Sequence, residues 1–281
     1  MLKKILPKES AQIGSSKFHL VLVGCGGTGS FLAGKNERLL TGSVIGETIG
    51  DILLIDGDSV EPKNVGRQLF SKRDTGKNKA EVLANRYNQA FGLDICWYPE
   101  FLTRDNFSEI IPHSSRNHPV LILGCLDTAA ARKIILDKVM DKWGNQAWWL
   151  DAGNGQYAGQ IVLGSTGSIE KISSGIGAYL VEYLPYPPLV FPDLVNPVQD
   201  IEKPLSCAEM LQSEEQSLNV NALVAGLMAE MLRLFLTGDL SYNIVQLDIS
   251  SFITVPNLVT DEWLEDYLSM MAVKELLPSL E

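Results

Sequence analysis

The sequence predicts an α/β fold: a doubly wound, largely parallel Rossmann-like sheet with helices on both faces, an additional antiparallel portion and a long crossover loop. Apolar runs of strand length alternate with helical segments through the first half of the chain. A glycine-rich motif joins the first apolar run to the first helix. After the fifth apolar run this alternation stops, which places a different arrangement in the second half.

The elements of the first half follow the order that parallel pairing requires. A continuous apolar run such as FHLVLV is typical of a parallel strand that is buried on both faces. Right-handed crossovers through the intervening helices place successive strands in one sheet. The predicted strands are residues 18–23, 51–55, 94–98, 120–124 and 147–150. One predicted helix follows the glycine-rich motif and ends near residue 40, and two others cover residues 77–91 and 128–143.

The second half begins with a strand, residues 159–164, that belongs to a different part of the sheet. Residues 165–217 lack periodicity and contain YLPYPPLVFPDLVNP, and so long an irregular segment is usually functional or mobile. A buried helix, a pair of closing strands and an amphipathic helix follow, at residues 218–236, 244–249, 252–255 and from 261 onward. We therefore expect one domain, residues 1–281, with a core at 18–164, the loop at 165–217 and a C-terminal part at 218–281.

Composition excludes several classes of function. The formal net charge of −11 and the pI of about 4.8 argue against binding to nucleic acids or to anionic membranes. The most apolar stretch, residues 218–236, carries charged and amide side chains, and the apolar run at the N-terminus is too short for a signal peptide. We therefore expect a cytoplasmic protein that does not cross a membrane.

The four cysteines are widely spaced and form no C-x-x-C pair. Neither a disulfide framework nor a zinc site with four cysteine ligands is expected from this spacing. The cysteines are Cys25, Cys96, Cys125 and Cys207.

The first candidate site residues are the glycines of a G-x-G-x-x-G motif, Gly24, Gly26, Gly27 and Gly29. The motif follows a strand and opens a helix, which is the setting that a nucleotide-binding loop requires. Glycine permits a tight turn, and the helix N-terminus attracts phosphate. The motif alone is as compatible with NAD as with ATP, and a purely structural turn is the alternative.

A second motif, Asp56-Gly57-Asp58, ends the second strand. A carboxylate at this position can accept hydrogen bonds from both ribose hydroxyls of a nucleotide. Since NAD and ATP both carry such a ribose, Asp56 does not discriminate between them, and Asp58 alone would fit an acidic turn.

The third motif does discriminate between these ligands. Asn64, Arg67 and Gln68 follow at once, and Lys79 comes soon after. A triphosphate needs such a cluster because its charge must be neutralised beside an incoming anion. A NAD-dependent oxidoreductase has no such need, although a solvated basic turn is the alternative.

Asp127 ends the fourth strand in the segment GCLDT. Its carboxylate can hold Mg²⁺ on the phosphates of a nucleotide. It can equally cap the helix that starts near Thr128, and from this residue alone the capping role is favoured.

Together these elements occur in the order G-x-G-G-x-G-S, D-x-D, N-x-x-R-Q, K and C-x-D. In this order the chain resembles the ThiF/MoeB/ubiquitin-activating enzyme superfamily over about residues 18–165. It looks most similar to the ThiF proteins of PRTRC systems, in NVGRQLFS, GCLDT, the WLDAGN and GQIVLG stretches and the later S-C-A-E.

The resemblance implies an ATP- and Mg²⁺-dependent adenylyltransferase that acts on the C-terminal carboxylate of a small ubiquitin-like protein. Its flexible tail would pass beneath a crossover loop at residues 165–217, and a conjugating-enzyme-like acceptor and a homodimer are further expectations. By resemblance, Asp56 would bind the ribose, Asn64, Arg67, Gln68 and Lys79 the phosphates, and Asp127 Mg²⁺, with Arg67 and Lys79 acting in catalysis.

Two features depart from the family pattern, and one residue has an open role. The paired C-x-x-C zinc site of MoeB is absent, so no zinc is expected, and the N-terminal segment lacks an R-x-x-R-like source of a basic group for a partner subunit. Cys207 could attack the acyl-adenylate to form a thioester, or it could be a small residue in a turn.

Three other interpretations of the sequence remain open. The first is a NAD-dependent oxidoreductase, which leaves Arg67, Gln68 and Lys79 unexplained. The second is a non-catalytic scaffold subunit, which the intact set of nucleotide-contacting positions disfavours. The third keeps adenylation but directs it to a peptide or to a tRNA base.

Overall fold

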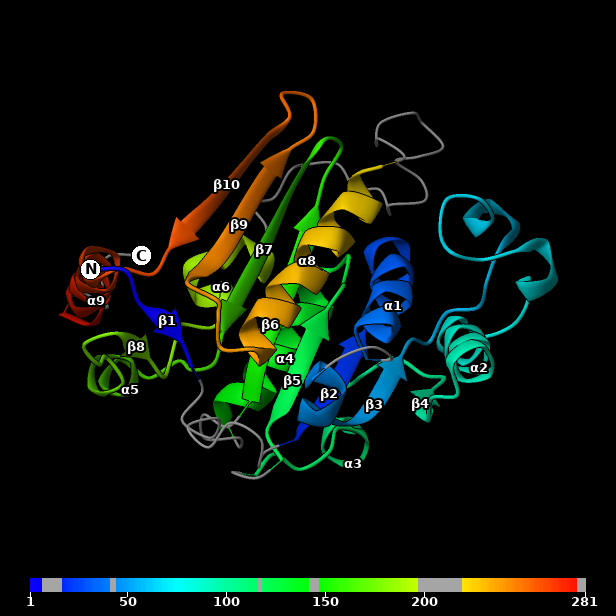
Figure 1. The fold of residues 1–281 in the computed structure, drawn as a ribbon, viewed down its shortest axis with the longest axis horizontal. Coiled ribbons are helices and arrows are strands. Elements are labelled where there is room, and N and C mark those ends of the chain that lie inside the picture. Colours follow the sequence, from blue (N-terminus) through cyan, green and yellow to red (C-terminus); the bar gives the residue numbers. More distant parts are fainter. Residues whose placement is uncertain (7–16, 41–43, 116–117, 142–146, 197–218, 277–281) are drawn as a thin grey trace.

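The protein forms an eight-stranded mixed sheet with helices on both faces, as a computed structural model shows (Figure 1). The structure describes residues 1–6, 17–40, 44–115, 118–141, 147–196 and 219–276. The strand order is β10-β9-β7-β6-β5-β2-β3-β4. β2 to β6 pair in parallel, whereas β7, β9 and β10 add antiparallel pairs. This architecture confirms the predicted fold class.

The strands of the large sheet are β2 (Phe18–Val23), β3 (Ile49–Ile55), β4 (Ile95–Tyr98), β5 (Val120–Gly124), β6 (Ala147–Asn154), β7 (Ala158–Gly164), β9 (Tyr242–Asp248) and β10 (Ile253–Leu258). The α-helices are α1 (Gly27–Leu40), α2 (Lys79–Phe91), α3 (Phe107–Ile110), α4 (Ala129–Asp141), α5 (Ile169–Ser174), α6 (Pro187–Val190), α8 (Val220–Leu236) and α9 (Asp261–Leu276). Short 3₁₀ helices are η2 (Val44–Thr48), η3 (Pro62–Asn64), η4 (Lys72–Asp74) and η5 (Pro192–Leu194).

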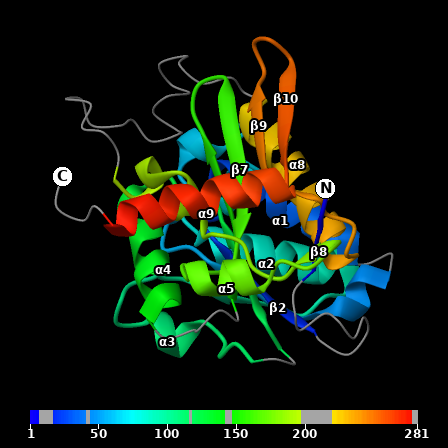
Figure 2. The ribbon, with the colours of Figure 1, turned by 90° about the vertical axis from the view of Figure 1, so that its left-hand side faces the viewer.

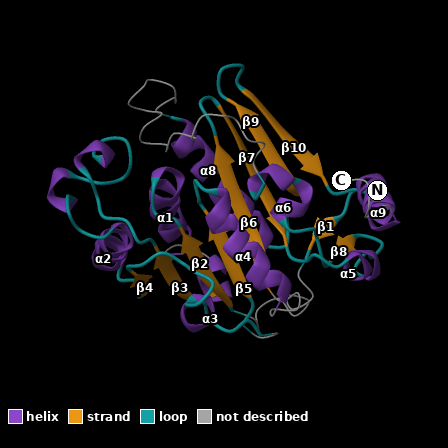
Figure 3. Ribbon diagram, turned by 180° about the vertical axis from the view of Figure 1, so that it is seen from behind, coloured by secondary structure: helices purple, strands orange, loops and turns teal. Residues whose placement is uncertain are grey.

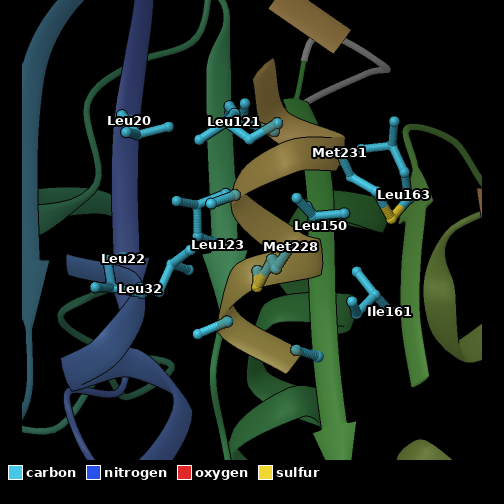
Figure 4. Close-up of a cluster of buried hydrophobic side chains, with 14 of the residues drawn as sticks. Leu20, Leu22, Leu32, Leu121, Leu123, Leu150, Ile161, Leu163, Met228 and Met231 are labelled. Atoms are coloured by element: carbon cyan, nitrogen blue, oxygen red, sulfur yellow. The ribbon is translucent and has the colours of Figure 1, made fainter. Parts of the chain in front are cut away.

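The central strands are apolar throughout because both of their faces are covered. Alternate residues of β2 enter two separate clusters: Leu20 and Leu22 face one, and Val21 and Val23 face the other. The first cluster lies under α1, α2 and α8, and Figure 4 shows Met228 of α8 among its leucines. The second lies under α3 and α4, which Figure 3 shows on the opposite side of the sheet.

Helix α8 is apolar nearly all round because it packs against both α1 and the sheet. Val224, Met228 and Leu232 are buried within the chain, while Leu223 on the outer side is 48% exposed. The apolar character of α8 is therefore largely explained without a second subunit. Among the described residues, no helix is both long and apolar enough to cross a membrane.

Several predicted boundaries differ from the structure. β6 continues from the predicted residue 150 to Asn154, because β7 returns beside it as an antiparallel partner. The last strand covers Ile253–Leu258 rather than 252–255, and α8 is described from Val220, so its predicted start at Leu218 lies outside the described residues.

Part of the segment that was predicted to be irregular, residues 165–196, contains α5, β8 (Leu180–Val181), α6 and η5. β8 pairs in parallel with β1 (Lys4–Ile5), two residues on each side. So short a pairing leaves no periodic pattern in the sequence. Figure 2 shows α9 running past α5 and β8 at this end of the molecule.

Candidate functional site

A pocket of about 470 Å³ opens where β2, β3, β5 and β6 end. Its wall includes the glycine loop, the segment after β3, the start of α2, Phe101 and Leu102, the β5–α4 connection with the first turns of α4, and the end of β6. The carboxyl ends of parallel strands are where such sheets bind ligands, and the volume suits a small molecule.

Most of the predicted site residues meet at this pocket. Those that line it are Gly24, Gly26, Gly27, Asp56, Asp58, Asn64, Gln68, Lys79 and Asp127. Gly29 and Arg67 lie nearby in sequence but do not form its wall, and Cys207 lies outside the described residues.

The glycine loop needs glycine for two reasons. Gly24 has φ +93°, and a Cβ there would lie 2.4 Å from the carbonyl oxygen of Cys125. A Cβ on Gly29 would lie 1.8 Å from the carbonyl oxygen of Gly24, so this glycine permits helix–strand packing. By contrast, the nearest atom to a Cβ on Gly26 is Gln68 Nε2 at 4.0 Å, so the backbone is open there for a ligand. Helix α1 starts at Gly27 and directs its N-terminus toward the pocket.

Asp56 is buried at the end of β3, where two backbone amides hold its carboxylate. Cys25 N donates to Oδ2 at 2.6 Å, and Asp58 N donates to Oδ1 at 2.8 Å. Burial raises the pKa of Asp56, and the nearby ammonium of Lys79 opposes this rise. Each carboxylate oxygen keeps a further lone pair for a ligand hydroxyl.

Lys79 stands at the first position of α2, with only 7% of its surface exposed. Its ammonium donates to Asp58 Oδ2 at 2.8 Å. Asn78 caps α2 by accepting from Glu81 N, and its Nδ2 donates to the carbonyl oxygen of Asp56 at 2.7 Å. The same cap thus joins the end of β3 to the start of α2 and places Lys79 in the pocket wall.

The segment after β3 is folded back on itself by Asn64. This buried side chain accepts from Glu61 N through Oδ1 at 2.8 Å, which leaves its amide Nδ2 as a donor for a ligand. Gln68 N donates to the carbonyl oxygen of Asn64 at 3.0 Å, and the buried Gln68 Oε1 has no hydrogen-bond partner within the described part of the chain. Arg67 follows Gly66, whose φ is +80°.

Asp127 and Thr128 have separate positions at the start of α4. The cap of the helix is Thr128, whose Oγ1 accepts from Ala131 N at 3.3 Å. Asp127 lies one residue earlier, exposed in the pocket wall. The capping role that the sequence favoured for Asp127 therefore belongs to its neighbour, and the Asp127 carboxylate is available to a ligand.

Two buried polar groups behind the wall were missed by sequence reasoning. Arg132 donates through Nε to Asp151 Oδ2 at 2.9 Å, and through Nη2 to the carbonyl oxygens of Leu126 at 2.6 Å and Ala152 at 3.1 Å. Burial raises the pKa of Asp151, against the effect of Arg132. The pair thereby holds the loop between β5 and α4 against β6.

The second missed group is Asn221 in the first turn of α8. Its Oδ1 accepts from Thr28 Oγ1 at 3.1 Å and from Asn154 Nδ2 at 2.6 Å. Asn154 belongs to the WLDAGN stretch, which is the sequence signal that could have indicated it. Lys63, Phe101 and Leu126 also line the pocket, and no motif had pointed to them.

Two cysteines lie at this end of the sheet, and neither is a ready nucleophile. Cys25 is fully buried, and Cys125 lines the pocket. Burial raises the pKa of both thiols. A low-pKa thiolate is thus not found among these two residues.

The donor set fits a magnesium ion held between protein and phosphates. Within the described residues, no three His, Cys, Asp or Glu side chains come close enough to hold a metal ion. Mg²⁺ usually needs only one or two carboxylates, together with phosphate oxygens and water. Asp127, with its free carboxylate, meets that requirement.

A family model described as the ThiF family matches residues 2–252. The chain belongs to the ThiF family. This ThiF protein is 32% identical over 127 residues to ubiquitin-like modifier-activating enzyme 5 of Branchiostoma floridae, a match that covers 42% of this chain and 29% of that protein.

Solved structures share the fold of this ThiF protein. Escherichia coli MccB with ATP superposes with a TM-score of 0.56 at 17% identity, covering 89% of this chain and 65% of MccB. The crystal structure of PaaA gives 0.55 at 16% identity, covering 89% and 66% of the two chains. The ThiF chain thus spans less than two thirds of the length of these relatives.

Proposed function

We propose that the protein uses Mg·ATP to adenylate the C-terminal carboxylate of a small ubiquitin-like protein. The observation that carries the proposal is the meeting of Asp56, Asn64, Gln68, Lys79 and Asp127 in one pocket beside an open glycine loop. Membership of the ThiF family and the match to an activating enzyme support it.

In the proposed reaction a carboxylate oxygen of the partner attacks the α-phosphorus of ATP. The bond to the bridging oxygen breaks, and pyrophosphate leaves. Asp56 would hold the ribose, while Asn64, Gln68 and Lys79 would stabilise charge on the phosphates. Arg67 would add to this charge stabilisation from beside the pocket. Bound Mg²⁺ would supply Lewis-acid stabilisation of the phosphate oxygens from Asp127.

The charge of the pocket supports a requirement for Mg²⁺. Its described wall contains four carboxylates and two lysines, and both lysines are already paired with wall carboxylates, Lys79 with Asp58 and Lys63 with Glu61. A polyphosphate without a divalent cation would meet net negative charge there, and the repulsion would be strong in a partly buried site.

The face on which the partner would dock is the β9–β10 hairpin. β10 is an edge strand, and Phe252 at the turn is 94% exposed, beside Ile253 at 54% and Val255 at 53%. Contiguous exposed apolar residues of this kind mark interaction surfaces.

We also propose a cytoplasmic setting, a homodimer and a single functional unit over residues 1–281.

The test is pyrophosphate–ATP exchange with candidate ubiquitin-like proteins that end in a flexible tail. Exchange should require the free carboxylate, so the same partner with a C-terminal amide is the matched control. Binding of NAD in place of ATP in a calorimetric titration would overturn the proposal.

We further propose that Cys207, which lies outside the described residues, receives the partner as a thioester. In that step its thiolate would attack the acyl carbon and AMP would leave. Cys207→Ala should retain exchange and lose a reductant-sensitive adduct between enzyme and partner. A wild type that makes the adenylate but no adduct would instead transfer the partner directly to an acceptor.

A second candidate substrate is a peptide. It is favoured by the fold shared with MccB, which was solved together with MccA. The exchange assay therefore includes short peptides, and exchange with a peptide but with no ubiquitin-like protein would select this alternative.

A further inference from the structure

We infer that Lys63 is an additional phosphate-binding residue of this pocket, a role that rests on the proposed use of ATP. Lys63 belongs to η3, the next element along the chain after β3, and no motif of the sequence marks it. In the structure it lines the same pocket as Asn64 and Lys79.

The balance of charge gives Lys63 its importance. The described wall of the pocket has two lysines, Lys63 and Lys79, against the carboxylates of Asp56, Asp58, Glu61 and Asp127. Lys79 is buried and donates to Asp58 at 2.8 Å, so part of its charge is already neutralised. A bound polyphosphate therefore needs further positive charge, and Lys63 stands in the wall that it would face.

The present partner of Lys63 can be exchanged for a ligand. Its ammonium lies 3.2 Å from Glu61 Oε2, and the two side chains are 33% and 57% exposed. An ion pair with this exposure contributes little free energy, because water screens both charges. The lysine side chain is long and flexible and ends in three rotatable donors, so it can turn from Glu61 to a phosphate.

The backbone beneath Lys63 is fixed, which keeps the lysine at the pocket. Asn64 accepts from Glu61 N at 2.8 Å, and Asn64 N donates to the carbonyl oxygen of Glu61 at 2.9 Å. These two bonds close the turn that carries Lys63. Substitution of its side chain therefore leaves the turn intact, since neither bond involves it.

The experiment is calorimetric titration of ATP, ADP and AMP, each with Mg²⁺, into the wild type and four variants. Lys63→Met should weaken ATP binding about tenfold, the loss of one charge-assisted contact, and should change AMP binding little. Lys63→Arg should restore most of the ATP affinity. Glu61→Gln should strengthen ATP binding, because it removes both the competing partner and a negative charge.

Lys72→Met is the matched control, because Lys72 is an exposed lysine of the next 3₁₀ helix and does not line the pocket. It should bind all three nucleotides like the wild type. Equal ATP affinity in Lys63→Met and wild type would overturn the inference. So would an equal loss for ATP and AMP, which would indicate a general disturbance of the site.

These outcomes are separable from failure of the proposed function. A wild type that binds no nucleotide overturns both proposals. A wild type that binds ATP, with the predicted loss in Lys63→Met, but that catalyses no pyrophosphate exchange with any partner contradicts adenylation alone and supports the role of Lys63.

Discussion

Asp127 and Thr128 are adjacent in the chain and both line the pocket, yet they make different contacts. Thr128 caps α4 through its hydroxyl, while the Asp127 carboxylate lies in the pocket wall. The two roles that the sequence offered for one residue are thus divided between two. This division allows each role to be tested by its own substitution.

Asp127→Ala should leave the free energy of unfolding nearly unchanged, because the helix cap remains. It should lower Mg²⁺-dependent pyrophosphate exchange by more than about a hundredfold, since metal coordination is worth several kcal/mol in the transition state. Thr128→Ala removes the helix cap and should lower the free energy of unfolding by about 1 kcal/mol. Thermal unfolding and exchange assays on both proteins measure this, and an active Asp127→Ala enzyme would contradict the magnesium role.

The buried Arg132–Asp151 pair predicts a pH-dependent effect on stability. Arg132→Met leaves a buried carboxylate without its partner and should lower the free energy of unfolding by about 3–5 kcal/mol near neutral pH. Burial already raises the pKa of Asp151, and loss of Arg132 would raise it further. A carboxyl with a raised folded-state pKa favours the fold when protonated, and this contribution disappears as the pH rises through that pKa.

The free energy of unfolding of Arg132→Met should therefore lie closer to that of the wild type near pH 5 than near pH 8. Denaturant unfolding at both pH values measures it. The double variant Arg132→Met, Asp151→Asn is the control and should show little of this pH dependence. A deficit in Arg132→Met that does not change with pH would contradict the assignment.

The β9–β10 hairpin is an exposed apolar surface with a strained turn. Phe252 has φ +57°, a conformation that suits asparagine better than phenylalanine. A residue that is nearly fully exposed and strained does not stabilise the fold. It is therefore the residue of the hairpin with which to test the proposed docking of a partner.

Phe252→Asn should maintain or raise the melting temperature, because asparagine tolerates this backbone conformation. The same change should raise the KM for the protein partner at least about tenfold, as loss of an aromatic anchor does. The affinity for ATP should not change, since the hairpin residue does not line the pocket. Unchanged partner KM would show that the partner docks elsewhere.

Lys3, the residue before β1, forms an ion pair with Asp261 at the start of α9, and the two side chains differ in burial. Lys3 is 2% exposed, and its ammonium lies 2.6 Å from Oδ1 of the exposed Asp261. The hydrogen bond from Lys3 holds the pKa of Asp261 below its usual range. Such a carboxylate stabilises the fold above its unfolded-state pKa, and this stabilisation is lost as the pH falls through the lowered folded-state value.

Asp261→Asn should therefore lower the melting temperature at neutral pH and flatten its decrease in acid. Lys3→Met combined with Asp261→Asn should recover part of the loss, because no buried ammonium is then left with carbonyl partners alone and no carboxylate. Scanning calorimetry between about pH 3 and pH 7 measures both effects. Equal acid sensitivity in wild type and Asp261→Asn would contradict this account.

For the whole molecule, the proposed homodimer can be tested in solution. The buried face of α8 is covered by α1 and the sheet, so a dimer that uses α8 must involve exposed residues such as Leu223. Solution scattering over a range of concentrations should give twice the chain mass, and Leu223→Lys should shift it toward that of one chain if α8 contributes. A monomer mass at every concentration would refute the dimer.

Local patterns in the sequence were enough to predict the parallel, doubly wound arrangement of the first half and the residues of the main motifs. Continuous apolar runs, a glycine-rich turn and Asp56 at a strand end are local signals, and each depends on a few neighbouring residues. Nearly all the motif residues then line one pocket, because the carboxyl ends of parallel strands lie at one edge of the sheet.

The contacts that hold the pocket together and complete it form only when distant parts of the chain fold against one another. Arg132 reaches Asp151, and Asn221 reaches Thr28 and Asn154, across separations in sequence that no local pattern encodes. The same holds for Lys63, whose charge matters because of the carboxylates that folding brings around it. The roles of these residues arise from buried hydrogen bonds and long-range charge balance, which depend on distances in space and not on spacing along the chain.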